Sequence, residues 1–268
     1  MPSRSVTRSP RTGPDPEAAE VRRERGLALV SPLLMLAIWE VLVRAGWLDA
    51  RFFPAPSGVA GTFWSLVVSG ELLRHLLASL GRIGAGFVLG AVPALVLGVL
   101  MSTIPVLRAA LNPVFAATFP IPKIAILPLI LILFGLGEAS KIVVIAVAVF
   151  YLVLFNTMAG VLGIPRIYAD VGRSFGAGRL RALLTIALPG ALPMIFTGFK
   201  LGGGVALLVI TAAEFVGARA GLGALIWDSW QTFSIERMFV GLVVISALGY
   251  AISLALDELQ RRCVPWRY

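Results

Sequence analysis

The sequence contains few of the residue types on which catalytic and metal sites depend. Its 268 residues include one cysteine, Cys263, and one histidine, His75. A single cysteine excludes a disulfide within the chain, and two such residues cannot supply the roughly four Cys or His ligands of a structural zinc site. Without a histidine cluster or a Ser–His–Asp set, the sequence predicts a protein that is not an enzyme and holds no metal.

Charged residues are also scarce. They make up 14% of the chain, while 58% of the residues are hydrophobic; soluble domains have about 25% charged residues. A chain of this composition lacks the polar surface to face water all round, so we expect lipid to surround much of it. The formal net charge is +9. In a membrane protein this charge indicates arginine-rich cytoplasmic loops and not a nucleic-acid partner.

Six segments are apolar over about the 20 residues that a helix needs to cross a bilayer. They predict an all-α, polytopic membrane protein with six transmembrane helices, at about 27–47, 75–101, 107–134, 141–163, 191–213 and 238–256.

Arginine placement predicts the orientation and the boundaries of the domain. Arginines cluster before the first segment, between the fourth and fifth, and after the sixth. With six crossings these regions share one side, which the excess of positive charge places in the cytoplasm together with both termini. Residues 1–26 are polar and are expected to form a disordered tail. The transmembrane domain is expected at 27–258, followed by a second tail at 259–268.

The third segment is irregular. Pro113, Pro120, Pro122 and Pro128 each remove a backbone donor and kink or break a helix. Broken backbone is tolerated at membrane depth only where protein or a wet cavity satisfies its polar groups. We therefore expect this segment to pack against helices of the same chain or of a second copy and not to face acyl chains.

Charges within or beside the predicted spans are costly unless they are paired or wet. The sequence has five of them: Glu40, Arg82, Lys123, Lys200 and Glu214. Near the helix ends, pairing or snorkelling accounts for Glu40, Arg82 and Glu214. Lys200 lies in the fifth predicted span, 11 residues after Pro189, or about 16 Å along a helix. It is the best candidate for facing a cavity.

One polar segment interrupts the apolar sequence between the fourth and fifth spans: "DVGRSFGAGRLRALLTIALP", at 170–189. A first helical piece, at Ile167–Phe175, can end at Gly176, because glycine supplies the positive φ of a tight turn. A second piece begins near Leu180 and is expected to end before Pro189. On these residues alone, the segment is either a docking element for a partner or an amphipathic connector at the membrane surface.

The segment resembles the EAA loop of the permease subunits of binding-protein-dependent ABC importers. The family pattern is Glu-Ala-Ala, three residues, Gly, nine residues and Ile-x-Leu-Pro, and both spacers are kept here. Asp replaces Glu, and Val-Gly replaces Ala-Ala, which weakens the first turn because glycine is a poor helix former. In that family the loop is the coupling helix, which docks into a groove on the ATP-hydrolysing subunit. The resemblance gives this role to Asp170, Val171, Gly172, Arg173, Gly176, Ala177, Ile186, Leu188 and Pro189.

The resemblance extends over about residues 72–256 and is to the subfamily that handles nitrate, sulfonates and taurine. It includes "SLGRIGAGFVLG" and "LPGALPMIFTGFKLGGGVALL". It implies a type I ABC importer permease fold in the cell inner membrane, and a homodimer of permease copies with two ATPase subunits that bind the ATP. A solute-binding protein would deliver a small oxyanion, and the chain itself would need no cofactor. The sequence has no G-x-x-x-x-G-K-[ST] motif, which agrees with a separate ATPase.

Our candidates for lining the translocation path are Lys200, Pro120, Pro122 and Lys123. Two other interpretations stay open. A secondary transporter driven by an ion gradient would show inverted repeats and buried carboxylates; the sequence shows no internal repeat. A vitamin precursor such as a pyrimidine is the alternative substrate within the importer family, because specificity rests mainly in the solute-binding protein.

Overall fold

The structure, a computed structural model, describes the backbone of residues 16–267. Over this range the regular elements are helices, which confirms the all-α prediction. The chain divides after Val59 into two units, each with its own internal packing. Residues 1–15, which make up most of the tail expected to be disordered, lie outside the described part.

The first unit contains α1 (Pro16–Arg44) and the start of α2 (Pro56–Val68). α1 begins at Pro16, although we expected the polar tail to extend to residue 26. Proline suits the first helical position because its φ is already set, and the residues that follow it are good helix formers.

Glu40 lies near the end of α1 and is paired, as expected. Its carboxylate accepts hydrogen bonds from Arg44 Nε at 2.6 Å and from Ser57 Oγ at 2.7 Å. The membrane crossing of the first segment, at 27–47, stays a prediction.

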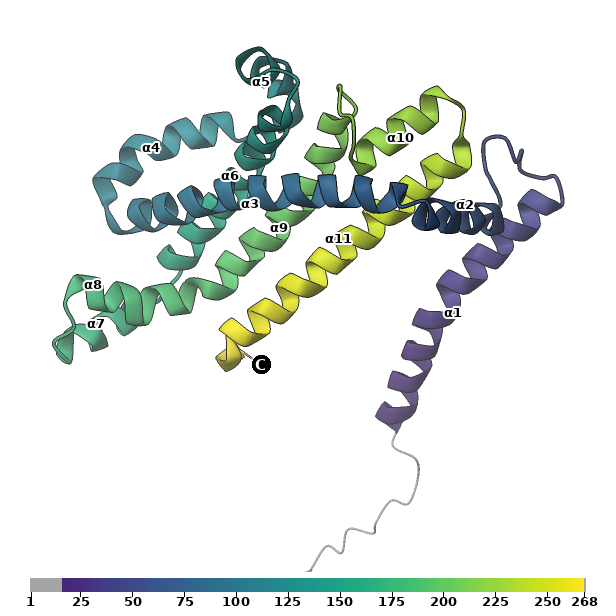
Figure 1. Cartoon of the computed structure of the whole chain (residues 1–268). Helices are drawn as coiled ribbons and strands as arrows, with labels where there is room; N and C mark the ends of the chain where they lie inside the picture. The colour runs from purple at the N-terminus through teal and green to yellow at the C-terminus, as the bar shows by residue number, and fades with distance from the viewer. Residues whose placement is uncertain (1–15, 268) are drawn as a thin grey trace, which may run out of the picture. The chain divides into compact units, whose positions relative to one another are not determined.

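The second unit holds the remaining helices (Figure 1). In chain order they are α3 (Glu71–Thr103), α4 (Pro105–Thr118), η1 (Lys123–Ile126), α5 (Leu127–Phe134), α6 (Glu138–Leu162), α7 (Arg166–Ser174), α8 (Arg179–Ala182), η2 (Leu183–Ala187), α9 (Leu188–Glu214), α10 (Leu222–Gln231), α11 (Ile235–Cys263) and η3 (Pro265–Arg267).

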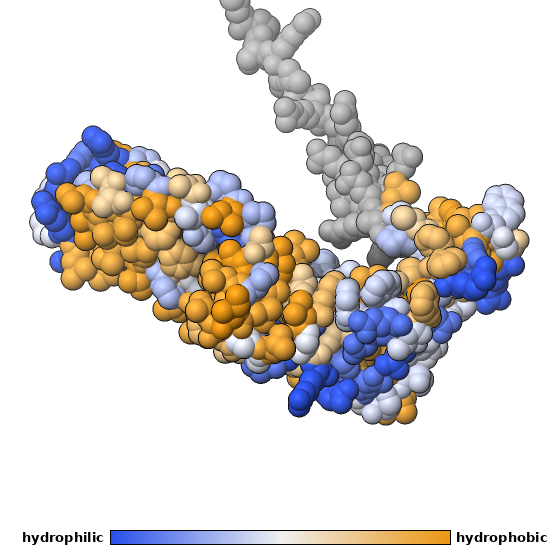
Figure 2. All heavy atoms as spheres, turned by 90° about the horizontal axis from the view of Figure 1, so that it is seen from above, coloured by the Kyte–Doolittle hydropathy of each residue, from blue (hydrophilic) through white to orange (hydrophobic). Residues whose placement is uncertain are grey.

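Within the described residues, four helices are long and apolar enough to cross a membrane: α3, α6, the continuous helix Arg179–Glu214 that includes α9, and α11. α4 and the η1–α5 segment are apolar enough when taken together, and they are bent by 90° at a break. Five of the six predicted spans therefore have a counterpart in the second unit. Figure 2 shows broad hydrophobic areas on one face of the molecule, as a chain surrounded by lipid requires.

The break in the third predicted span falls where the prolines predicted it. Pro120 and Pro122 stand between α4 and η1, where the helix cannot continue because two backbone donors are missing. On α5, Leu127 and Ile130 are buried, whereas Ile132 is 81% exposed. The chain thus covers one face of this segment itself and leaves another face open.

The core of the second unit forms where α3 and α9 pack against α6. Val149 of α6 is fully buried between them. A Cβ added to Gly86 of α3 would lie 2.6 Å from Cβ of Ile145, and one added to Gly198 of α9 would lie 2.8 Å from Cβ of Asn156. Glycine at these positions therefore allows the helix backbones to approach closely, as is usual in membrane bundles.

A charge network joins α3, α6 and α9. Its members Arg82 and Glu214 are buried, whereas the side chain of Glu138 is 65% exposed. The guanidinium of Arg82 donates to Glu214 Oε1 at 2.6 Å and to Glu138 Oε1 at 2.6 Å. Glu214 also accepts from Ser79 Oγ and from the backbone N–H of Gly223, each at 2.8 Å. Arg82 and Glu214, for each of which we expected pairing or snorkelling, are paired, and they pair with each other. Their burial is tolerated because each charge is paired and hydrogen-bonded.

Removing Arg82 should be strongly destabilising. Arg82→Gln leaves the carboxylate of Glu214 buried without its ion-pair partner, and breaking a buried pair in this way costs about 3–5 kcal/mol. We expect a large fall in the thermal unfolding midpoint of the detergent-solubilised protein. The midpoint is measured by size-exclusion chromatography of samples heated to a series of temperatures. Arg261→Gln removes an exposed pair with Glu258 and should leave the midpoint almost unchanged. Equal midpoints for Arg82→Gln and wild type would show that the network does not hold the helices together.

Candidate functional site

The polar segment between the fourth and fifth predicted spans folds into α7 and α8, joined by a tight turn (Figure 1). Gly176 has a φ of +74°. Its N–H donates to the carbonyl oxygen of Arg173, and the N–H of Ala177 donates to that of Gly172, both at 2.9 Å. This pair of hydrogen bonds is the Schellman arrangement that closes helices on a left-handed residue. The prediction that the first piece ends at Gly176 is confirmed.

The beginning and the end of the coupling motif touch each other. Gly172 is buried, and a Cβ added to it would lie 2.7 Å from Cδ1 of Ile186. Glycine therefore leaves room for Ile186 at a position where the family pattern has alanine. On the exposed side of α7, Asp170 forms an ion pair with Arg173. The structure thus brings the two halves of the predicted coupling motif together.

The prediction that the second helical piece ends before Pro189 is wrong. α8 continues through η2, a π-helical turn, into α9, so that Arg179–Glu214 is one helix. The hydrogen bonds of a π turn reach one residue farther than those of an α turn and widen the helix. The wider turn accommodates a proline ring that would otherwise clash with the carbonyl four residues before it. Leu188 and Pro189 therefore form the first turn of α9 without ending the helix.

α7 presents an apolar stripe to the outside. Ile167, Val171 and Phe175 follow one another at four-residue spacing, and they are 63%, 47% and 87% exposed. We call these three residues the α7 stripe; residues four apart share one face of a helix. Val171 is one of the predicted coupling residues; Ile167 and Phe175, which share its face, were not among them. Their i, i+4, i+8 spacing in the sequence was the signal that could have identified them.

Lys200, our best candidate for facing a cavity, is paired within the chain. Its Nζ forms an ion pair with Asp257 and donates a hydrogen bond to Gln260 Oε1 at 2.7 Å, both on α11. Lys200 therefore links α9 to α11, and the carboxylate of Asp257 balances its charge.

At the break between α4 and η1 lie the other three path candidates, Pro120, Pro122 and Lys123. Lys123 Nζ donates hydrogen bonds to the carbonyl oxygens of Thr118 and Phe119, at 2.9 and 3.0 Å. It also lies 4.0 Å from the centre of the Tyr151 ring on α6. The two carbonyls stand at the end of α4, where the helix no longer supplies their i+4 donors; that of Thr118 also accepts from the backbone N–H of Ile121, at 3.3 Å.

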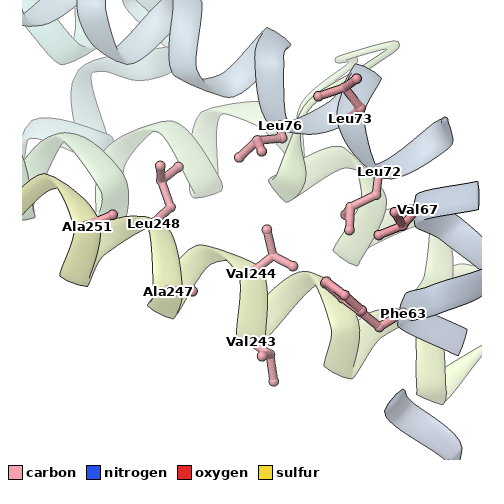
Figure 3. A pocket seen from close by; sticks show the side chains of 10 residues that line it. All are labelled: Phe63, Val67, Leu72, Leu73, Leu76, Val243, Val244, Ala247, Leu248 and Ala251. Carbon is pink, nitrogen blue, oxygen red and sulfur yellow. The ribbon is translucent and has the colours of Figure 1, made fainter. Parts of the chain in front are cut away.

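An apolar groove of about 650 Å³ opens between α2, α3 and α11 (Figure 3). Phe63 and Val67 of α2 and Leu76 of α3 line it opposite Val244 and Leu248 of α11. All of its lining side chains are apolar, so the groove has no group that could orient a polar solute. It is therefore not a candidate for the translocation path.

Comparison with known proteins identifies a family of transport permeases. The family described as "Binding-protein-dependent transport system inner membrane component" matches residues 85–266. The chain is 31% identical to the taurine transport system permease protein TauC of Escherichia coli, over 91% of this chain and 90% of that protein. It is 31% identical to the putative aliphatic sulfonates transport permease protein SsuC of Bacillus subtilis, over 95% of each. It is 35% identical to the riboflavin transport system permease protein RibX of Chloroflexus aurantiacus, over 96% of this chain and 97% of that protein.

The fold is similar to that of a chain of the MetNI methionine ABC transporter in an inward-facing conformation. The TM-score is 0.65 at 22% identity, and the match covers 72% of this chain and 95% of that one. This likeness confirms the predicted type I ABC importer permease fold. The chain therefore belongs to the inner membrane components of binding-protein-dependent transport systems, as a multi-pass permease subunit of an ABC importer that is not itself an enzyme, holds no cofactor and works with a separate ATPase subunit and a solute-binding protein.

Proposed function

We propose that this chain forms the membrane path of an ATP-driven importer for a sulfonate-type oxyanion. The observation that carries the proposal is the pair of relatives named for taurine and for aliphatic sulfonates, each 31% identical over at least 91% of this chain. The solute-binding protein would release the oxyanion into a path lined by Lys200, Pro120, Pro122 and Lys123. The riboflavin relative, at 35% identity, supports a vitamin or vitamin precursor as the second candidate substrate.

The loop at 166–189 is the proposed coupling element. The α7 stripe gives it an exposed apolar face of the kind that inserts into a groove on a partner. The turn at Gly176 fixes the direction in which α7 meets α8, and α8 is continuous with α9. Movement imposed on α7 by closure of the ATPase subunits would therefore be carried into the membrane. The permease would alternate between inward-open and outward-open states with no covalent step in this chain.

A second copy of the chain is the proposed cover for the open face of α5. Ile132 and Leu133 are 81% and 68% exposed. They lie on α5, the helix that follows the break, and broken backbone needs protein or a wet cavity around it at membrane depth. Two copies related by a two-fold axis would cover both open faces and enclose the path between them.

The loop at 166–189 and both chain termini are proposed to be cytoplasmic. If α9 and α11 each cross the membrane, the loop that precedes α9 and the end of α11 lie on the same side. Exposed arginines mark it in both places: Arg173, Arg179, Arg181, Arg261 and Arg262. The positive-inside rule makes this side the cytoplasm. The transmembrane domain at 27–258, with tails at 1–26 and 259–268, completes the proposed organisation.

The wild-type complex should import sulfonates at the expense of ATP. We expect proteoliposomes that contain the permease, its ATPase and its solute-binding protein to take up labelled taurine or ethanesulfonate when ATP is supplied. A protonophore should leave this uptake unchanged, because no ion gradient drives it. Uptake of riboflavin without uptake of either sulfonate would replace the substrate assignment, and uptake that needs an ion gradient and no ATP would contradict the importer mechanism.

Gly176→Asp should disable coupling while leaving the membrane helices intact. The residue has a φ of +74° and open space around it, so the backbone angle is what a Cβ strains, by about 1 kcal/mol or more. We expect normal insertion and normal docking of the solute-binding protein, but loss of ATPase co-purification or of the coupling of hydrolysis to uptake.

Gly178→Asp is the matched control for this turn. Gly178 lies in the same loop and has equally open space, but its φ of −67° is one that any residue adopts. It should behave as wild type. Full ATPase binding and full uptake in Gly176→Asp would mean that the loop is only a connector.

Reporter fusions should place the loop inside. Fusions after Gly176 and after Leu256 are expected to be active with a cytoplasmic reporter and inactive with alkaline phosphatase, which requires export. Alkaline phosphatase activity from the fusion after Gly176 would reverse the proposed orientation and remove the basis for ATPase docking at this loop.

A further inference from the structure

Most cations of the membrane-spanning helices are balanced by, or sealed among, groups of the same chain. Arg82 pairs with two glutamates, and Lys200 pairs with Asp257. Lys141, 2% exposed, is closed off near the start of α6. Lys123 differs from Arg82 and Lys200 because, over the described residues, no carboxylate lies within ion-pair distance of it. It differs from Lys141, which also donates to two backbone carbonyl oxygens, because its side chain is only half-buried.

The ammonium of Lys123 lies near the middle of the membrane-spanning bundle. It is 4.0 Å from the centre of the Tyr151 ring. Tyr151 follows Glu138, the first residue of α6, by 13 residues and precedes Leu162, the last, by 11; these separations are about 20 and 16 Å along the helix. A charge at this depth is costly unless it is paired or faces a wet cavity. The two carbonyl oxygens beside Lys123 meet this need in part, and because its side chain is only half-buried, an anion or water can meet the rest.

The contacts of Lys123 leave part of its charge and one donor unused. An ammonium group has three N–H donors, and here two of them reach the carbonyl oxygens of Thr118 and Phe119. The end of a helix carries only about half a negative charge, and the Tyr151 ring adds a weaker cation–π attraction. Among the described residues no acceptor meets the third donor.

We infer that Lys123 is the anion contact of the translocation path: one oxygen of a sulfonate or a similar oxyanion accepts the third N–H as the solute passes the break between α4 and η1. This inference rests on the proposed function, because it names the group that the transported anion meets. Pro120 and Pro122 support the arrangement, since without their backbone donors the break cannot close into a continuous helix and bury the ammonium.

The positive charge of Lys123 is only partly compensated by its neighbours, and this suits a transport site. A path must hold a solute strongly enough to admit it and weakly enough to release it. Two carbonyl oxygens and a ring face already satisfy much of the ammonium, so a single remaining donor gives a weak, transient contact. Lys200, whose charge Asp257 balances, would add little to the attraction of an anion.

The test compares Lys123→Gln, Lys123→Arg and Lys200→Gln in the complete complex reconstituted into proteoliposomes. The glutamine amide keeps two N–H donors for the carbonyl oxygens at the end of α4 and removes the charge. We expect Lys123→Gln to lower taurine and ethanesulfonate uptake by about tenfold or more, as for the loss of one charge-assisted hydrogen bond. ATPase co-purification and the stimulation of ATP hydrolysis by the loaded binding protein should persist, so that less solute enters per ATP. Lys123→Arg, which keeps the charge, should retain much of the uptake, and Lys200→Gln should have the smaller effect.

Three results separate failure of this inference from failure of the proposed function. Wild-type uptake in Lys123→Gln would overturn the inference and leave the importer intact. Equal loss of uptake and of ATP hydrolysis in Lys123→Gln and Lys123→Arg would show that Lys123 only caps α4, and it would also overturn the inference. Absence of sulfonate uptake by the wild-type complex would overturn the proposed function, and the inference with it.

Discussion

Hydrocarbon offers no hydrogen-bond partner, and this constraint decides where the polar groups of the chain lie. Each charge or freed backbone group at membrane depth must be satisfied by protein or by water in a cavity. The network around Arg82 and Glu214 meets this requirement at one end of the bundle, and the pair of Lys200 and Asp257 meets it between α9 and α11. The break at Lys123 meets it only in part. Our inference is that at this break a solute anion or water completes what the carbonyl oxygens and the Tyr151 ring leave unsatisfied.

The continuity of α8 with α9 gives the proposed coupling loop, at 166–189, a mechanical connection to the rest of the bundle. Arg179–Glu214 is a single helix of 36 residues, about 54 Å long at 1.5 Å per residue. One end adjoins the Gly176 turn, and the other carries the carboxylate that pairs with Arg82. Had the helix stopped at Pro189, a hinge there could have absorbed movement of α7. The π turn before Pro189 instead keeps the connection, so displacement of the loop reaches the far end of α9.

The features that local rules govern could be predicted from the sequence, and those that depend on distant pairing could not. Apolar length, proline and glycine predicted the five spans of the second unit, the break at Pro120 and the turn at Gly176, but not α10. The passage through Pro189 was missed because a π turn has no local sequence signature comparable to that of a glycine cap. The partner of Lys200 was missed because Asp257 belongs to another helix, and nothing in the spacing of the two residues shows that they meet.

The incomplete features of this chain argue for a subunit that ATP drives and not for a gradient-driven transporter. A transporter of either kind could have the partly compensated charge of Lys123 and the exposed apolar face of α5. The α7 stripe is different, because Ile167, Val171 and Phe175 stand on a polar loop outside the spans and are exposed there. Apolar side chains in such a place are costly in water unless a partner covers them. Either a partner protein or the membrane surface could cover the stripe, and the proposed docking of a separate ATPase gives it a partner that a transporter powered through its own spans lacks.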